Sequence, residues 1–376
     1  MTLPAWTRDL TPHIGAYLDR LCVPEQVGRY RPATAGLTPE GERVTLGFSC
    51  YAHKIVYMLG LWDTLPEADR AAWNAYLLSF QVHGNPLKDW AARNAFVDPV
   101  VADTLVRQEP RLSWRERLHA RRHPSWELNH FRRTMIAETK QAVATLAQVG
   151  VPTHHPYDAF PQQPNDVQIY LAALDWAQPW GAGAQLATLS VFFRTEAPRL
   201  LPAADVTALV STACGFVDEV LDAETGAYFL GETPDHGNLI NGAMKVLTAL
   251  DWLEVPVHQP ERLIDTCLAQ PPRSEGCHLV DAVYVLYRCA QQTEHRRDDI
   301  RTYCTQLLNM IERHYVPQEG GFSYNVGASQ TVYYGVTITR GEPVADIHGT
   351  ILLTWALTMI FELLGANPDG WRVIRP

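Results

Sequence analysis

Apolar residues recur at helical spacing through most of this chain, and alternating segments bounded by turn residues are scarce. Apolar positions three and four residues apart are typical of helices, whereas strict alternation is typical of half-buried strands. Proline- and glycine-containing loops separate the apolar stretches. The pattern predicts an all-α fold.

Six segments share one plan, in which a few small or polar residues precede a strongly apolar helix. They are 49–62, 136–150, 179–193, 239–253, 276–289 and 345–361. Amphipathic stretches such as 203–221 and 296–315 lie between them. A helix that is apolar on nearly every side must be buried all round, whereas an amphipathic helix covers it and faces water. We therefore predict an α/α toroid of about six inner and six outer helices.

The loops between these segments fit this arrangement. Residues 222–231 and 317–325 each carry acidic and glycine residues and then an aromatic residue before an inner segment. Glycine permits a tight reversal of the backbone, and we expect the aromatic ring to fill the gap between the two layers. The run GAGA at 181–184 is interpreted as close helix packing. No linker divides the chain, so we predict one domain over 1–376, less regular over about 1–135.

Composition limits the kinds of partner that we expect the protein to bind and the compartment in which we expect it. The chain has 376 residues, 47% hydrophobic and 19% charged, and a net charge of −10, which disfavours nucleic-acid binding. Its seven cysteines form no CxxC pair, and its start lacks the pattern of a secretory signal. No uninterrupted apolar run reaches the length of about 18 residues that a membrane span needs. We expect a cytoplasmic protein with a small-molecule substrate; the sequence does not indicate its oligomeric state.

The loop-and-helix pairs GAYF…NGAMKVLTAL and GGFSY…DIHGTILLTWAL resemble the glycine-aromatic repeats of the terpenoid cyclase and protein prenyltransferase superfamily of α/α toroids. The resemblance is clear over the second half of the chain. It implies an enzyme that works in the central cavity of the toroid.

Two segments carry the resemblance residue by residue. HLVDAVY (278–284) is similar to the prenyltransferase segment that supplies an Asp and then a Cys to zinc; Asp281 keeps the first position and Val283 replaces the cysteine. DIHGT (346–350) is similar to the segment that supplies the zinc histidine, here His348. The resemblance thus implies Asp281 and His348 as ligands of a possible zinc ion, and the nearby Cys277 or His278 is a candidate to replace the missing thiolate.

The cyclase branch of the family uses a different signature. Its Asp-x-Asp-Asp run, which supplies the acid that protonates an alkene or epoxide, does not occur here. Asp346 occupies a similar place at the start of a helix, and it would have to be kept protonated by burial in order to act as an acid. An N-cap is the alternative interpretation of Asp346.

Polar residues at the starts of the inner helices are the functional candidates, because these ends converge on one side of the toroid. They are Cys50, His53, Lys54, Glu138, Thr139, Lys140, Gln185, His236, Asn238, Asn241, Lys245, His278, Asp281, Asp346 and His348. From these we assign catalysis to Asp281, His348 and Asp346, and substrate binding to His53, His236, Asn238, Asn241 and Lys245, with Trp180, Tyr228, Tyr324, Tyr333 and Tyr334 as aromatic walls. Capping is the alternative for the two asparagines.

Three functions remain open at this point. The first is an enzyme that acts on an isoprenoid or other apolar substrate through acid/base or metal-assisted chemistry. The second is a carbohydrate-active toroid, with Asp281 and Asp346 as its carboxylates and His236, Asn238 and a tyrosine beside them. The third is a toroid that binds a ligand or a protein without catalysis. The sequence contains no GxSxG, P-loop, GxGxxG-after-strand or HExxH motif that would indicate another class.

Overall fold

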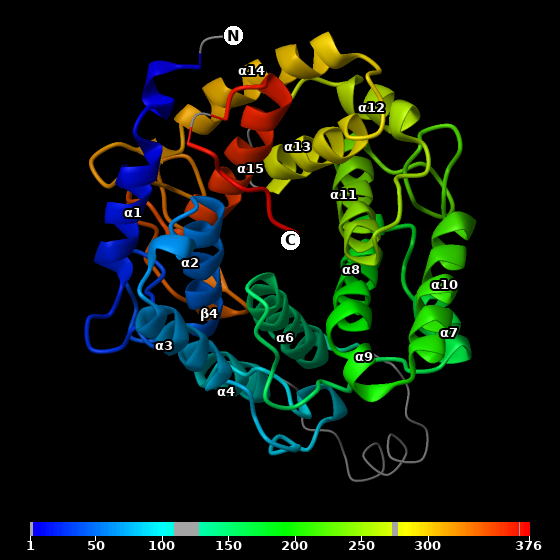
Figure 1. Ribbon diagram of the computed structural model, residues 1–376, viewed down its shortest axis with the longest axis horizontal. Helices are drawn as coiled ribbons and strands as arrows, with labels where there is room; N and C mark the ends of the chain where they lie inside the picture. Colours follow the sequence, from blue (N-terminus) through cyan, green and yellow to red (C-terminus); the bar gives the residue numbers. More distant parts are fainter. Residues whose placement is uncertain (1–2, 109–127, 273–276, 368) are drawn as a thin grey trace.

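Six helices of the computed structural model form a closed inner ring (Figure 1). The structure describes residues 3–108, 128–272, 277–367 and 369–376. In ring order the helices are α2 (Leu46–Met58), α6 (His130–Gln148), α8 (Pro179–Thr195), α11 (His236–Leu253), α13 (Cys277–Ala290) and α15 (Ile347–Leu364), and α15 packs back against α2. Each overlaps one of the six segments predicted to be inner helices. The predicted all-α toroid is confirmed.

A second layer of helices covers the ring from outside. It consists of α1 (Leu10–Leu21), α3 (Glu67–Leu78), α4 (Pro99–Gln108), α7 (Pro164–Ala172), α10 (Ala203–Glu219), α12 (Pro260–Leu268) and α14 (Arg297–Glu312), with the short α9 (Ala197–Leu200). Single 3₁₀ turns lie at Ala5–Thr7 (η1), Trp62–Thr64 (η2) and Trp90–Ala92 (η3). The two stretches predicted as outer helices correspond to α10 and α14.

The inner helices bury hydroxyl residues without leaving most of them unpaired. Thr139, Thr248 and Thr358 each donate to the carbonyl four residues earlier, at 2.8–3.0 Å. This back-bonding satisfies the hydroxyl within its own helix, so a polar residue can occupy a fully packed position. The free energy cost of burying these groups is therefore small compared with that of an unpaired hydroxyl.

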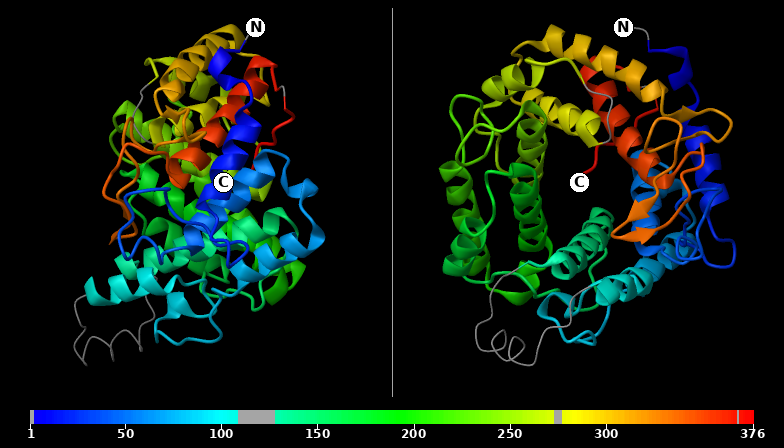
Figure 2. Two further views of the ribbon diagram at one scale, coloured as in Figure 1. Left: turned by 90° about the vertical axis from the view of Figure 1, so that its left-hand side faces the viewer. Right: turned by 180° about the vertical axis from the view of Figure 1, so that it is seen from behind.

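Different segments of the chain cover the two ends of the ring. On one side lie two small hairpins, β1 (Tyr315–Val316) with β2 (Gly321–Phe322) and β3 (Val332–Tyr333) with β4 (Val336–Thr337). The C-terminal tail lies on the opposite side, as the left view of Figure 2 shows. It is fixed there by Trp252 Nε1, which donates to the Pro376 carbonyl at 2.9 Å, and by Arg372 N, which donates to Met58 O at 2.8 Å.

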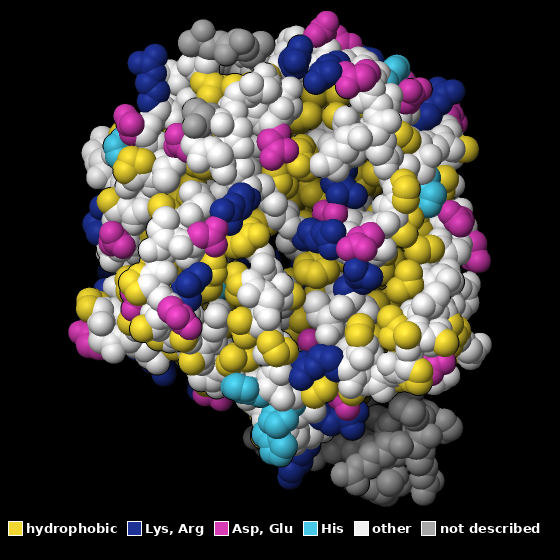
Figure 3. All heavy atoms as spheres, viewed as in Figure 1, with side chains coloured by type: hydrophobic (Ala, Val, Ile, Leu, Met, Phe, Trp, Pro, Cys, Tyr) yellow, Lys and Arg dark blue, Asp and Glu magenta, His cyan; other side chains and the backbone are white. Residues whose placement is uncertain are grey.

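Arginine side chains hold the ring on the face that carries the tail. Asp251, near the C-terminal end of α11, accepts from Arg288 at 2.6 Å and lies 3.6 Å from Arg375 of the tail. Glu254 pairs with Arg194 at the end of α8 at 2.9 Å. Figure 3 shows basic and acidic side chains side by side around the middle of this face. Cations near the C-terminal ends of helices also interact favourably with the helix dipoles.

Helices α8 and α11 approach closely because glycines line their contact. A Cβ atom added to Gly183 would lie 2.8 Å from the Cβ of Lys245 and 3.2 Å from the Gly242 carbonyl. A Cβ on Gly242 would lie 2.5 Å from the Cβ of Pro179. The interpretation of GAGA as close helix packing is confirmed. The same contact fixes the position of the Lys245 Cβ atom.

The two glycine-aromatic loops join the layers as expected. Gly226 adopts a φ of +72° and Gly320 a φ of +76°, which favours glycine at both turns. Tyr228 and Phe322 are fully buried behind these turns. Tyr228 donates or accepts a hydrogen bond at 3.0 Å with His258 Nδ1, so its hydroxyl is paired within the outer layer.

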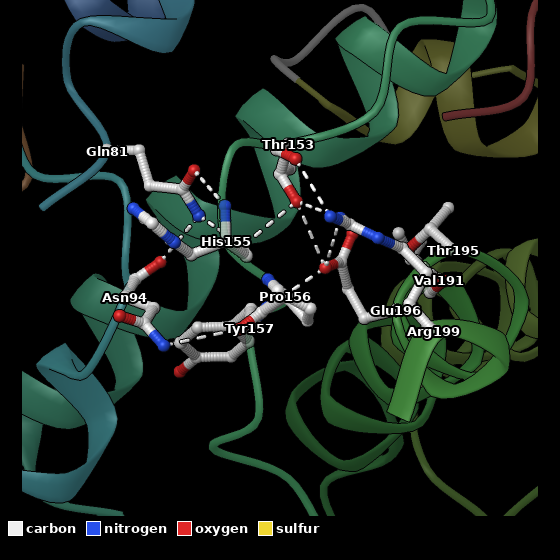
Figure 4. A network of polar contacts seen from close by, with 10 residues as sticks. All are labelled: Gln81, Asn94, Thr153, His155, Pro156, Tyr157, Val191, Thr195, Glu196 and Arg199. Carbon is white, nitrogen blue, oxygen red and sulfur yellow. Dashed lines mark hydrogen bonds and ion pairs between the residues drawn. The ribbon is translucent and has the colours of Figure 1, made fainter. Parts of the chain in front are cut away.

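A polar network anchors the loop before α7 to the ring (Figure 4). The buried carboxylate of Glu196 accepts from Tyr157 N at 2.9 Å and from the Thr153 hydroxyl at 3.2 Å, and Arg199 contacts both Glu196 and Thr153. Gln81 exchanges two hydrogen bonds with the backbone of His155. The network fixes the histidine-containing loop 153–158 through hydrogen bonds to its backbone atoms.

Helix α15 is the one described helix that is long and apolar enough to cross a membrane. However, 78% of it is buried among the other helices. Its apolar surface therefore forms part of the protein core, as the inner-helix pattern predicts.

The close contact between α8 and α11 generates a stability prediction. Gly183→Ala is expected to lower the free energy of unfolding by about 1–3 kcal/mol, because its methyl group overlaps the stem of Lys245. The matched control is Gly181→Ala, two residues earlier, where a Cβ meets nothing within 4 Å. The control is expected to be neutral or to stabilise by up to about 1 kcal/mol through helix propensity. Urea unfolding followed by circular dichroism measures both, and equal effects of the two substitutions would contradict the packing argument.

Candidate active site

Two groups of polar and aromatic side chains lie near the starts of the inner helices. The first surrounds His348 at the start of α15 and also contains Tyr51, Tyr324, Gln330 and Asp346; we call it the His348 group. The second surrounds Asp281 in α13 and also contains Asn241, His278, Lys245 and Trp180; we call it the Asp281 group. Their central residues come from neighbouring helices of the ring.

The imidazole of His348 lies between two tyrosine rings. Its centroid is 5.0 Å from that of Tyr51 and 4.9 Å from that of Tyr324, with interplanar angles of 12° and 25°. Nδ1 lies 3.0 Å from Oε1 of Gln330. Because an amide oxygen only accepts, Nδ1 carries the hydrogen and Nε2 keeps its lone pair. Burial lowers the pKa of His348 to about 4, so the ring is neutral at pH 7.

Asp346 caps α15 and holds the loop that precedes it. Its Oδ1 accepts from Gly349 N at 2.8 Å, and its Oδ2 accepts from Tyr324 N at 2.6 Å and Gln330 N at 3.2 Å. Burial raises the pKa of Asp346 to about 6, and the backbone N–H donors oppose that rise. Both oxygens are engaged by the backbone. The structure therefore shows Asp346 as the N-cap of α15, the alternative interpretation given above, and its catalytic role stays a prediction.

Tyr333 and Tyr334 pack beside the His348 group. The Tyr333 ring lies 5.0 Å from Phe48 and 4.5 Å from Tyr334, and Tyr334 adopts a positive φ of 45°. Burial raises the pKa of both tyrosine hydroxyls, and neighbouring charges, that of the buried Glu138 carboxyl among them, add to the rise. The Oε1 atom of Glu138 has no hydrogen-bond partner among the described residues. Burial raises the pKa of Glu138 well above its ordinary value.

Asn241 connects the members of the Asp281 group. In the amide orientation that satisfies both neighbours, its oxygen accepts from His278 Nδ1 at 2.8 Å and its nitrogen donates to Asp281 Oδ2 at 3.2 Å. Asp281 is 2% exposed. Burial raises its pKa to about 7, against the opposing effect of Lys245. The ammonium group of Lys245 lies 5.9 Å from the ring centre of Trp180, whose side chain is exposed.

Four residues that we assigned to substrate binding contact the outer layer or a helix cap. His53 packs on Trp62 at 4.1 Å and contacts Asn74 of α3 at 3.3 Å, so it faces the outer layer. His236 Nε2 contacts the Thr266 carbonyl of α12 at 3.0 Å. Asn238 donates to Asp235, the N-cap of α11, at 2.5 Å, which is the capping alternative. Tyr228, as described above, belongs to the outer layer. Helical periodicity alone does not distinguish the two sides of a helix that is buried all round.

The donor set does not fit a three-ligand zinc site. The described residues contain no group of three or more His, Cys, Asp or Glu side chains that could hold a metal ion. Asp281, His278 and His348 therefore do not converge as three ligands, although structural and catalytic zinc sites need at least three. Zinc binding stays a prediction.

Sequence reasoning missed Tyr51 and Gln330, which fix the ring and the tautomer of His348. Neither belongs to a motif; Tyr51 follows the candidate Cys50 in an inner segment, and Gln330 lies in a loop 18 residues before His348. The sequence also has an arginine-rich stretch at 113–133, whose pattern favours a solvated helix face over an anion site; its residues 113–127 lie outside the described residues.

No family model matches the chain, and no curated protein sequence matches it. Structures of a type II terpene cyclase, MstE from Scytonema, match 94–95% of this chain and 96–97% of their own. At the level of fold, the chain resembles terpene cyclases. The sequence identities are 10–14% and the TM-scores are 0.38–0.41, so the likeness concerns the path of the chain and not its residues. Two of those structures contain geranylgeranyl dihydroxybenzoate and one contains merosterolic acid A.

The environment of Asp281 predicts a dependence of stability on pH. Its pKa rises from 3.8 to about 7 on folding, so between these values the folded state keeps a proton that the unfolded state loses. Asp281 therefore destabilises the fold as pH rises, by roughly 4 kcal/mol at most above pH 7. Asp281→Asn is expected to become more stable than the wild type as pH rises from 5 to 8.5. The exposed Asp205→Asn serves as control in urea unfolding, and a pH-independent effect of the Asp281 substitution would contradict the burial argument.

Proposed function

We propose that this protein is an enzyme that cyclises or isomerises an isoprenoid-type, largely apolar substrate in the centre of its ring by proton transfer. One observation supports this above the others. A buried carboxyl with a raised pKa, that of Asp281, and a neutral histidine, His348, come from the neighbouring inner helices α13 and α15. Groups whose environments shift their pKa values in ways that suit proton donation and acceptance are characteristic of acid/base sites.

Asp281 is the proposed acid. Its pKa of about 7 means that a large share of the molecules carry the carboxylic proton at neutral pH. Asn241 fixes Oδ2 and leaves Oδ1 to direct that proton. An apolar substrate would exclude water from the group and hold it protonated more firmly.

His348 is the proposed base. Its Nδ1–H is committed to Gln330, so Nε2 is the atom that accepts a proton. The flanking rings of Tyr51 and Tyr324 fix the imidazole plane, and their faces stabilise positive charge nearby.

The reaction balances without a cofactor. Transfer of the Asp281 proton to an alkene carbon leaves a carbocation on the neighbouring carbon and a carboxylate on the enzyme. Attack by a second alkene forms a carbon–carbon bond and moves the positive charge. Loss of a proton from an adjacent carbon to His348 Nε2 forms the product alkene, an isomer of the substrate. Exchange with water returns the proton to Asp281.

The carbohydrate-active alternative receives less support from the geometry. Its second carboxylate, Asp346, accepts three backbone N–H groups, and His236 and Asn238 pair with outer-layer and capping groups. A binding toroid without catalysis remains the outcome if the following experiment fails.

The proposal predicts a deuterium-labelled isomer. Linear isoprenoids, with geranylgeraniol and geranylgeranyl-substituted benzoates as probes, are incubated with the protein in D₂O and the products are analysed by mass spectrometry. We expect a product with the composition of the substrate and one carbon-bound deuterium. Asp281→Asn is expected to lower the rate by about 10²–10⁴-fold. The rate is expected to fall as pH rises through about 7, where Asp281 loses its proton, and as pH falls through about 4, where His348 gains one.

The exposed Asp205→Asn is the matched control and is expected to keep full activity. Full activity of Asp281→Asn, with its fold verified by circular dichroism, contradicts the role of Asp281. A product without deuterium contradicts protonation as the first step. Absence of conversion of every linear isoprenoid by the wild type contradicts the substrate class.

A further inference from the structure

Two histidines from separate loops meet at the surface of the protein. Nδ1 of His83 lies 3.1 Å from Nε2 of His155, and the ring centroids lie 4.5 Å apart at an interplanar angle of 48°. The contact is exposed, and the two residues are 72 positions apart in the sequence. Histidine side chains gather at the lower edge of the face drawn in Figure 3. The proposed reaction uses neither His83 nor His155.

The backbones beside the two imidazoles are fixed by other side chains. Gln81, two residues before His83, exchanges hydrogen bonds with the backbone of His155 at 2.6 and 3.1 Å (Figure 4). Asn94 accepts at 2.9 Å from the N–H of the residue after His83, and donates at 3.4 Å to the carbonyl of the residue after His155. The loops are thus joined on both sides of the histidine pair. A ligand that binds both rings therefore requires little reordering of the chain.

The spacing of the two nitrogens suits a metal ion. A bond between a zinc-sized ion and an imidazole nitrogen is about 2.0–2.1 Å long. For two nitrogens 3.1 Å apart, bonds of that length meet at the ion at an angle of about 98°. This angle lies between the roughly 90° of square-planar or octahedral coordination and the roughly 109° of a tetrahedron. Both rings can therefore bind one ion with little movement.

We propose that His83 and His155 form a binding site for a divalent transition-metal ion, with Cu²⁺ preferred over Ni²⁺ and Zn²⁺. Imidazole nitrogen suits these ions, whereas Mg²⁺ and Ca²⁺ prefer oxygen ligands. Among the three, a nitrogen site generally binds Cu²⁺ most tightly. Two protein ligands are fewer than the three of a zinc site, so water molecules complete the coordination. Copper and nickel accept a square arrangement that includes two adjacent imidazoles.

Binding of the ion moves one hydrogen within the pair. In the neutral pair, one nitrogen of the contact donates a hydrogen bond and the other accepts it. A neutral imidazole carries its hydrogen on either ring nitrogen, so the donor ring moves its proton to the nitrogen that faces away. Each ring then offers a lone pair to the ion, and the charge of each imidazole is unchanged. Acid, which protonates imidazole, is expected to release the ion.

A bound ion would link two segments of different helices. His83 belongs to the segment between α3 and η3, and His155 to the segment between the inner helix α6 and α7. An ion that binds only the folded chain raises the free energy of unfolding as its concentration rises. The site does not depend on the proposed function, because both histidines lie outside the Asp281 and His348 groups.

Calorimetric titration of the untagged, metal-free protein with Cu²⁺, in glycine as a competing ligand, tests the site. We expect one tight site per chain and a loss of affinity of about 10²-fold in both His83→Gln and His155→Gln, because each variant keeps only one of two linked ligands. The double variant is expected to lose no more than either single variant, since both residues bind the same ion. His154→Gln, at the exposed neighbour of His155, is the matched control and is expected to bind as the wild type does.

Three outcomes of this titration overturn the proposal or its choice of ion. Unchanged Cu²⁺ affinity in His83→Gln overturns the pair. A loss in His154→Gln as large as that in His155→Gln overturns it as well, because the ion then binds within the loop 153–158 alone. Tighter binding of Zn²⁺ than of Cu²⁺ overturns the preference for copper. Circular dichroism verifies the fold of each variant.

Thermal unfolding with Ni²⁺ provides a second readout that depends on the link between the two segments. The Tm of the wild type and of His154→Gln is expected to rise with Ni²⁺ concentration. The rise is expected to disappear in His83→Gln and in His155→Gln, which leave one imidazole and no link. A rise of the same size in His83→Gln as in the wild type overturns the inference.

Discussion

Each inner helix is apolar on almost all sides, and such a helix is stable in water only when neighbours surround it. A ring of six satisfies this condition for every member at once, because each helix has two ring neighbours and an outer helix behind it. The outer layer, the hairpins and the C-terminal tail all follow from that requirement. Glycine at the α8–α11 contact and back-bonded threonines inside the helices permit the close packing that ring closure needs.

The same constraint makes unpaired polar residues on the inner helices candidates for function. In a fully packed position a side chain is either paired locally or held at a high free energy cost. Asp346 is paired with three backbone donors, and His53 lies against the outer layer. Asp281 and Glu138 keep carboxyl groups whose pKa values burial raises and which the described fold does not fully compensate. These groups are where a ligand would lower the free energy most.

The proposed reaction is divided between two helices. The proposed acid comes from α13 and the proposed base from α15. Such a distribution makes the proposed site a property of the closed ring and not of any single segment.

The sequence by itself determined the helical class and the six inner segments and identified Asp281 and His348 as candidates, because apolar periodicity and local motifs are properties of contiguous residues. Only the tertiary structure decided which side of a buried helix faces the centre. It moved His53, His236 and Tyr228 to the outer layer and showed Asp346 to be a cap. It also brought together Tyr51, Gln330 and His348 from distant parts of the chain. Contacts between residues so far apart depend on ring closure, which no local pattern encodes.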